Sequence, residues 1–105
     1  MILEIAMLEV KPGLEEQFEV DFKIASTYIS SIKGYLKHSL QKCIEQKNKY
    51  VLLVEWKTME NHTVDFRKSR DYLEWKKLLH HYYDLFPIVE HFEKIFENRN
   101  LSDAN

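Results

Sequence analysis

Two segments of the chain, residues 2–10 (ILEIAMLEV) and residues 50–56 (YVLLVEW), are apolar at nearly every position. Alternate side chains of a β-strand point to opposite faces of a sheet, so each segment predicts a strand that is apolar on both faces. In the first segment, residues of odd number oppose residues of even number: Leu3, Ile5 and Met7 against Ile2, Ala6, Leu8 and Val10. A sheet built from such strands needs cover on both faces.

The residues after the first segment change to a helical period. Lys11, Pro12 and Gly13 interrupt the strand, and apolar side chains then recur every three or four residues over 14–29, as Leu14, Phe18, Phe22, Ala25 and Ile29. This spacing predicts an amphipathic helix. The acidic pair Glu15 and Glu16 is expected on its solvated face.

A hairpin and two short helices are predicted next. Gly34 ends the helical region, residues 35–44 (YLKHSLQKCI) form a second strand, and the polar turn 46–49 joins it to strand 50–56 as an antiparallel hairpin. Thr58 is expected to cap a helix with one buried stripe, formed by Met59, His62, Thr63 and Phe66. Ser69 or Asp71 caps another helix, which Pro87 ends, with a stripe of Tyr72, Trp75, Leu79 and Tyr82.

The last strand is predicted over residues 88–95. The order strand, helix, strand, strand, helix pair, strand is typical of an α+β, ferredoxin-like βαββαβ fold, an antiparallel sheet with helices on one face. Residues 1–96 form this domain, and residues 97–105 form a polar, frayed tail. Because the helices can cover only one face, we expect a homodimer in which two sheets pack face to face and form a dimeric α/β barrel.

Composition excludes several classes of function. A chain of 105 residues with a net charge of −2 and no basic block predicts no nucleic-acid partner. No apolar run approaches the roughly 20 residues that cross a bilayer, and the N-terminus lacks the basic region of a signal peptide. Cys43 is the only cysteine, which favours a reducing compartment. We therefore expect a cytoplasmic protein without a membrane partner.

Two histidines are candidates for acid–base chemistry. His62 shares its predicted helical stripe with Phe66, and a histidine pKa near neutrality suits proton transfer. His91 lies in the predicted last strand, where it alternates with Val89. Each has a structural alternative, a core histidine hydrogen-bonded to its neighbours. The sequence leaves open whether the two histidines meet.

Aromatic side chains suggest a ligand pocket near these histidines. Such a pocket is mostly apolar with a few polar groups, and its candidate walls are Trp56, Phe66, Tyr72, Trp75 and Tyr83. The alternative is that they are core residues. No metal site is predicted, because the adjacent residues His80 and His81 would point about 100° apart on a helix and no HxxxH or HExxH motif occurs.

Several segments together resemble the antibiotic biosynthesis monooxygenase family, whose members are small dimeric α+β barrel proteins. The resemblance spans residues 1–95 and rests on KPGLEEQF, GYLKHSL, YVLLVEWKTMENHTVDFRKS, YLEWKKLL and PIVEHFE, in that order. It implies a ferredoxin-like fold and dimerisation through the sheets. The family's haem-degrading branch is disfavoured, because residues 2–10 contain no asparagine, and Phe66 and Lys76 stand where that branch has its tryptophan and histidine.

The resemblance implies a monooxygenase that needs no cofactor and acts on a small aromatic or polyketide-like substrate in an apolar pocket. In this hypothesis His62 is the preferred base, with His91 contributing to the same pocket. The alternative is a non-catalytic, ligand-binding or stress-related dimer. These two hypotheses differ in whether a bound aromatic molecule is turned over.

Overall fold

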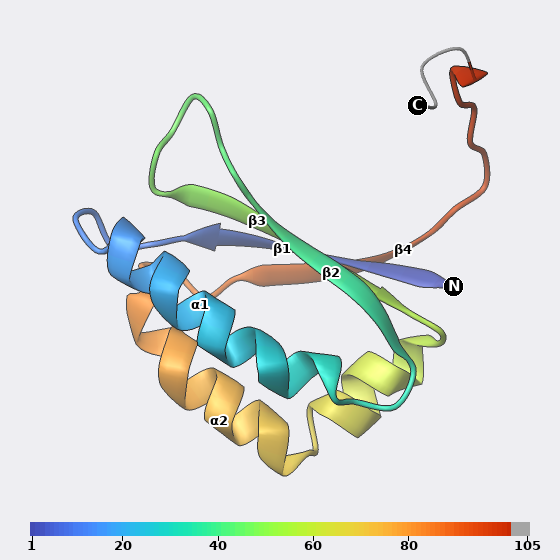
Figure 1. Ribbon diagram of the computed structural model, residues 1–105, viewed down its shortest axis with the longest axis horizontal. Coiled ribbons are helices and arrows are strands. Elements are labelled where there is room, and N and C mark those ends of the chain that lie inside the picture. The colour runs from blue at the N-terminus through green and yellow to red at the C-terminus, as the bar shows by residue number, and fades with distance from the viewer. Residues whose placement is uncertain (102–105) are drawn as a thin grey trace.

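The computed structural model describes residues 1–101 as one four-stranded antiparallel sheet with helices on one side (Figure 1). The spatial order of the strands is β2-β3-β1-β4, and the order along the chain confirms the predicted βαββαβ pattern. The elements are β1 (Ile2–Glu9), α1 (Glu15–Ser30), β2 (Tyr35–Lys42), β3 (Lys49–Trp56), η1 (Asn61–Phe66), α2 (Arg70–Leu79), η2 (His80–Tyr82) and β4 (Ile88–Glu93).

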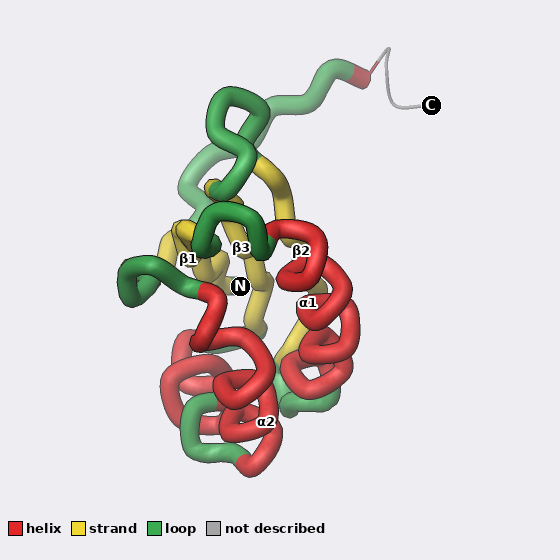
Figure 2. Tube along the Cα trace, turned by 90° about the vertical axis from the view of Figure 1, so that its left-hand side faces the viewer, coloured by secondary structure: helices red, strands yellow, loops and turns green. Residues whose placement is uncertain are grey.

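The core lies between the sheet and the helices. Even-numbered residues of the two central strands are buried there, including Leu8 on β1 and Val54 on β3. From α1, Phe18 and Phe22 pack against this face, and Trp75 of α2 contacts the Phe22 ring edge-on. Figure 2, turned by 90°, also shows α1 and α2 together on the same side of the strands. The predicted stripe of α1 is therefore confirmed.

The opposite face of the sheet has no cover from residues 1–101 (Figure 1). Its apolar side chains are cross-strand neighbours: Met7 of β1 is paired with Val51 of β3 and with Ile88 of β4, and Ile5 is paired with Leu53. Met7 is 43% exposed and Ile88 is 72% exposed. The two-faced strands read from the sequence are thus real, and the sheet of one chain is open rather than closed into a barrel.

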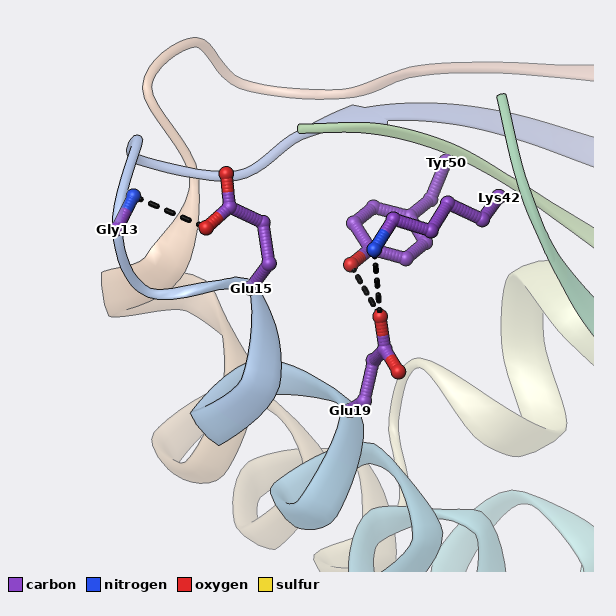
Figure 3. Close-up of polar contacts among 5 residues, drawn as sticks. All are labelled: Gly13, Glu15, Glu19, Lys42 and Tyr50. Carbon is purple, nitrogen blue, oxygen red and sulfur yellow. Dashed lines mark hydrogen bonds and ion pairs between the residues drawn. The ribbon is translucent and has the colours of Figure 1, made fainter. Parts of the chain in front are cut away.

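Two acids at the start of α1 fix the helix to its surroundings (Figure 3). The Glu15 carboxylate accepts a hydrogen bond from the backbone N–H of Gly13, and Glu15 is 8% exposed. The expectation that it lies on a solvated face was wrong, because the side chain folds back over the turn. One turn later, Glu19 accepts a hydrogen bond from the Tyr50 hydroxyl at 2.6 Å and pairs with Lys42.

The segment after β3 is a π-helix rather than an α-helix. In η1 the N–H of Arg67 donates to the carbonyl of His62, five residues earlier. This wider turn places His62 and Phe66, four residues apart, on the buried side, while Met59 is 45% exposed. The predicted stripe of Met59, His62, Thr63 and Phe66 is therefore only partly correct. Short π-helices are frequent at functional sites.

Asparagine 61 anchors the start of η1. The side-chain oxygen of Asn61 accepts hydrogen bonds from the backbone N–H and the hydroxyl of Thr58, and its amide donates to Asp65. This buried amide fills the space beside Gly34, which precedes β2. The network fixes where η1 begins and therefore where His62 lies.

The end of the chain departs from the prediction in its details. Ser69 caps α2 by accepting from the N–H of Tyr72, but the helical region ends at Tyr82, well before Pro87, because Tyr83 forms a β-bridge with Val10. β4 ends at residue 93, two residues earlier than predicted. Residues 97–101 of the predicted tail are exposed, and residues 102–105 lie outside the described residues. Over residues 1–101, no helix has both the length and the apolar character needed to span a bilayer.

The two glycines provide a matched test of this anchoring. Both have positive φ, +92° at Gly13 and +85° at Gly34, so alanine is strained at either position by about 1–2 kcal/mol. An added Cβ at Gly34 would also lie 2.0 Å from the Asn61 oxygen, whereas nothing lies within 4 Å at Gly13. We expect Gly34→Ala to lower the free energy of unfolding by about 1–3 kcal/mol more than Gly13→Ala, in urea denaturation. Equal losses would contradict this.

Candidate functional site

A buried carboxylate lies at the centre of the candidate site. Glu4 on β1 faces the helices and is 4% exposed, and its cross-strand neighbours are Val54 of β3 and His91 of β4. The indole Nε1–H of Trp56 donates to Glu4 Oε1 at 2.9 Å. A buried carboxylate needs such partners, because burial of an unpaired charge is costly.

His62 connects Glu4 to the edge of the sheet. Its Nε2 atom lies 3.4 Å from Glu4 Oε1, and its Nδ1 atom lies 2.8 Å from Nε2 of His91. The imidazole stacks on the Trp56 ring, with centroids 5.6 Å apart and an angle of 26°. These contacts join residues from β1, η1 and β4 in one row, the Glu4–His62–His91 chain. The two histidines that the sequence could not connect are in direct contact.

Burial sets the charge states of the Glu4–His62–His91 chain. Desolvation raises the pKa of Glu4 to about 6, although the Trp56 hydrogen bond and the charge of Arg67 act in the opposite direction. Desolvation lowers the pKa of His62 to about 3, helped by the charge of Arg67, and also lowers the pKa of His91. At neutral pH the carboxylate is ionised and both imidazoles are neutral.

These charge states fix the tautomers. With Glu4 ionised, His62 presents its Nε2–H to the carboxylate, and its Nδ1 lone pair accepts the Nε2–H of His91. The Glu4–His62–His91 chain therefore carries one negative charge, close to the positive charge of Arg67.

A cavity of about 60 Å³ lies beside the Glu4–His62–His91 chain, between the sheet and the helices. Its polar lining comes from Glu4, His62, Arg67, Tyr72, His80 and Tyr83, and its apolar lining from Ala6, Leu8, Ile29, Leu52, Phe66, Trp75, Pro87 and Val89. This volume holds a few water molecules, whereas a cavity of about 150 Å³ is known to accept benzene. Larger hollows of about 570 and 370 Å³ lie on the uncovered face of the sheet, around Leu3 and Met7.

The predicted aromatic walls divide into two groups. Phe66, Tyr72, Trp75 and Tyr83 line the cavity. Trp56 is fully buried, and it donates a hydrogen bond to Glu4 and stacks on the His62 ring. The sequence placed these side chains near the histidines, and the structure gives Trp56 a polar contact that spacing could not show.

Three polar residues at the cavity were missed by the sequence analysis. Glu4 shares the even-numbered face of β1 with Ala6 and Leu8, so alternation alone could have flagged it as a buried acid. His80 lines the cavity with a buried Nδ1 atom that has no hydrogen-bond partner within residues 1–101. Arg67 carried no sequence signal, because it follows η1 and is exposed.

The arrangement suits proton transfer better than metal binding. Glu4 and His91 contact opposite nitrogens of the His62 ring, so the three groups do not converge on one point. Across residues 1–101, no group of three or more histidine, cysteine, aspartate or glutamate residues is arranged to hold a metal ion.

Comparisons with known proteins agree on one family. The family model described as antibiotic biosynthesis monooxygenase matches residues 1–78. The uncharacterized protein YczJ of Bacillus subtilis (strain 168) is 55% identical over 95 residues, which are 90% of this chain and all of YczJ. A Bordetella bronchiseptica structure that carries the family's name is 38% identical with a TM-score of 0.87, covering 90% of this chain and 97% of that one.

A more distant structure shares the fold. SnoaB, a cofactor-independent oxygenase from Streptomyces nogalater, superimposes with a TM-score of 0.76 over 95% of both chains at 16% identity. At that identity the likeness extends to the fold and not to individual site residues.

The raised pKa of Glu4 predicts a pH-dependent stability difference. The pKa of a glutamate in the unfolded chain is 4.5, and that of Glu4 in the folded chain is about 6. The protonated carboxyl therefore contributes to the free energy of unfolding in full below pH 4.5, and this contribution is lost as the pH rises through 6. This rise in the pKa of Glu4 corresponds to about 2 kcal/mol of free energy. Relative to the wild type, Glu4→Gln should therefore gain about 2 kcal/mol in free energy of unfolding between pH 4 and pH 7, in urea denaturation at each pH. A difference that is constant with pH would refute the shift.

Proposed function

Because the chain belongs to the antibiotic biosynthesis monooxygenase family, we propose that it is a cofactor-independent monooxygenase acting on a small aromatic or polyketide-like substrate. The observation that carries this proposal is the Glu4–His62–His91 chain beside an aromatic-lined cavity. The structural likeness to SnoaB, itself a cofactor-independent oxygenase, supports the same reaction type.

The proposed reaction needs only dioxygen and a base. A phenol or enol loses a proton to the protein, and its anion gives one electron to dioxygen. The two radicals combine into a C–O bond, the peroxide loses water, and a carbonyl remains. A ring CH₂ or its phenolic equivalent plus O₂ thus becomes C=O plus H₂O, with no other reductant. The protein contributes a base, orientation and exclusion of water.

The site residues have distinct roles in this proposal. The histidine pair, His62 and His91, belongs to the acid–base machinery, and Phe66, Tyr72 and Trp75 form walls against a flat ring. The ring needs more than the 60 Å³ of the cavity, so substrate entry requires these walls to move apart. Tyr83 and Pro87, at the junction before β4, border the cavity where the chain has no regular structure.

A second candidate is a ligand-binding dimer without turnover. The aromatic lining of the cavity favours it as well, since apolar walls with a few polar groups bind a flat ring whether or not a reaction follows. It predicts saturable binding of an aromatic ligand with no oxygen uptake, and so the two candidates are separated by one assay.

We also propose that the protein is a homodimer through the uncovered face of the sheet. Met7, Val51 and Ile88 form a contiguous apolar surface there, and burial of apolar surface stabilises association by about 25 cal/mol per Å² before its entropic cost. Two such sheets packed face to face would complete the barrel that one chain leaves open.

The oxygenase proposal predicts saturable oxygen consumption by metal-stripped protein with a panel of anthrones, naphthols and hydroquinones, followed with an oxygen electrode. His62→Ala should reduce kcat/KM about 10²-fold or more, because loss of acid–base machinery has effects of that size. The matched control is His81→Ala, an exposed histidine on η2, which should leave the rate unchanged. Wild-type protein that binds these compounds without oxygen uptake would overturn the oxygenase in favour of the binding dimer.

The dimer proposal predicts different outcomes for neighbouring residues of β3. Val51 faces the uncovered side and Leu52 is buried beneath the helices. Val51→Lys should give a folded monomer, whereas Leu52→Lys should unfold the chain, since an unpaired buried charge costs several kcal/mol. Light scattering after size exclusion and circular dichroism measure the two outcomes. A wild-type monomer at micromolar concentration would refute the dimer.

A further inference from the structure

The contacts of the two His62 ring nitrogens leave this residue poorly placed to take a proton from a substrate. Its Nε2 faces Glu4 and its Nδ1 faces His91, so neither nitrogen offers a free lone pair. Nδ1 of His91 has no hydrogen-bond partner within residues 1–101, but His91 is not among the residues that line the cavity. A base for the cavity must therefore be another group.

Glu4 meets this requirement. Its carboxylate lines the cavity, Oε1 accepts the Trp56 N–H and faces His62, and Oε2 receives no hydrogen bond from residues 1–101. We propose that Glu4 is the catalytic acid–base residue, and that His62 and His91 are positioning residues that connect it to solvent. This inference rests on the proposed oxygenase, since it names the group that starts that reaction.

The proton step balances within the site. The O–H bond of the phenol or enol breaks, its electron pair stays on the substrate oxygen, and a new O–H bond forms on Glu4. The neutral carboxyl then returns this proton to the peroxide anion, which becomes a C–O–O–H group. The C–H bond on the same carbon then breaks, its electron pair forms the C=O bond as the O–O bond breaks, and the C–H proton leaves with the hydroxide as water. The negative charge of the site moves from Glu4 to the substrate and back, while its total stays constant.

The histidines give Glu4 a path to solvent. His91 lies on the edge strand β4 and is only partly buried. A proton that arrives at His91 Nδ1 releases the Nε2 proton to His62 Nδ1, and His62 releases its Nε2 proton to Glu4. Each histidine gains one proton and loses one, Glu4 gains one, and the reverse sequence returns the proton of Glu4 to solvent. The row consists of a 2.8 Å hydrogen bond between the two rings and a 3.4 Å contact between His62 Nε2 and Glu4 Oε1, which has to shorten before a proton crosses it.

The other groups around Glu4 favour an ionised base. Arg67, after η1, places a positive charge near the carboxylate, and Trp56 of β3 donates to it. Tyr72 of α2, His80 of η2 and Tyr83 line the same cavity. Burial raises the pKa of Tyr83 and lowers that of His80, so these two side chains are neutral at pH 7. No group facing Glu4 from these elements therefore adds a second negative charge.

One arm of the test needs no substrate. Nuclear magnetic resonance of ¹³C-labelled glutamate and ¹⁵N-labelled histidine in the intact protein follows Glu4, His62 and His91 across pH 4–8. We expect one shared transition near pH 6, seen at the carboxyl and at both rings, that disappears in Glu4→Gln. A Glu4 carboxyl that titrates without any change at the two rings would overturn the connected chain, whether or not the protein is an oxygenase.

The second arm measures oxygen uptake against pH with the best phenol of the panel. Wild-type kcat/KM should fall as the pH drops through about 6, because protonated Glu4 cannot act as a base. Glu4→Gln should lose about 10²–10⁴-fold and this acidic limb. The control is Glu15→Gln, another buried glutamate, which lies outside the cavity and should keep both rate and limb.

Conservative variants separate positioning from catalysis. His91→Gln keeps a donor for His62 Nδ1 and should retain more activity than His91→Ala, with the acidic limb present in both. If Glu4→Gln keeps the wild-type kcat/KM and its fall at acidic pH, the catalytic role of Glu4 is overturned, and the oxygenase proposal still holds. Wild-type protein without oxygen uptake, but with the shared titration intact, would overturn the oxygenase and this catalytic role while leaving the connected chain standing.

Discussion

The contact on which the site depends is the one that keeps a carboxylate inside an apolar core. Glu4 sits on the helix-facing side of the central strand β1, where ionised side chains are costly unless paired. Its partners come from two other elements: the indole of Trp56 from the neighbouring strand β3 and the imidazole of His62 from η1. The π-helical turn of η1, held by the Asn61 amide against Gly34, is what places His62 within reach. Removal of any of these supports would leave a buried charge without compensation.

The two faces of the sheet serve different purposes, because helices cover one face and leave the other exposed. The helix-covered face holds a small cavity, with a few polar groups in a mostly apolar lining, inside an aromatic core. The other face carries Met7 and Ile88 without cover from the described residues. Since alternate residues of the same strand serve the two faces, a register shift of one residue in β1 or β3 would move the side chains of each face to the other. This sharing explains why both strands are apolar almost throughout, and why the few polar positions, Glu4 above all, carry meaning.

Periodicity predicted the fold well and the site incompletely. The change from a period of two to periods of three and four residues located β1, α1 and β3 to within a residue or two, since burial enforces these patterns. Periodicity could not predict the contact between His62 and His91, which are 29 residues apart. That contact depends on the β1–β4 register, in which Glu4 is paired with His91, and on a π-helical turn that no local propensity encodes. Glu4 itself was predictable, because its even number places it beside Ala6 and Leu8. Arg67 was not, because an exposed arginine after a helix has no distinguishing pattern.

Desolvation raises a further question, since a dry cavity also disfavours the ionised substrate that the reaction needs. The burial that raises the pKa of Glu4 to about 6 would raise the pKa of a bound phenol as well. Transfer of a proton from the phenol to Glu4, however, moves one negative charge over a short distance and creates no new charge, so the desolvation cost is shared by reactant and product. The positive charge of Arg67 borders the same cavity and can stabilise the anion at either position. A buried acid–base pair of this kind can therefore run a deprotonation that neither group would support if it were alone in the same apolar surroundings.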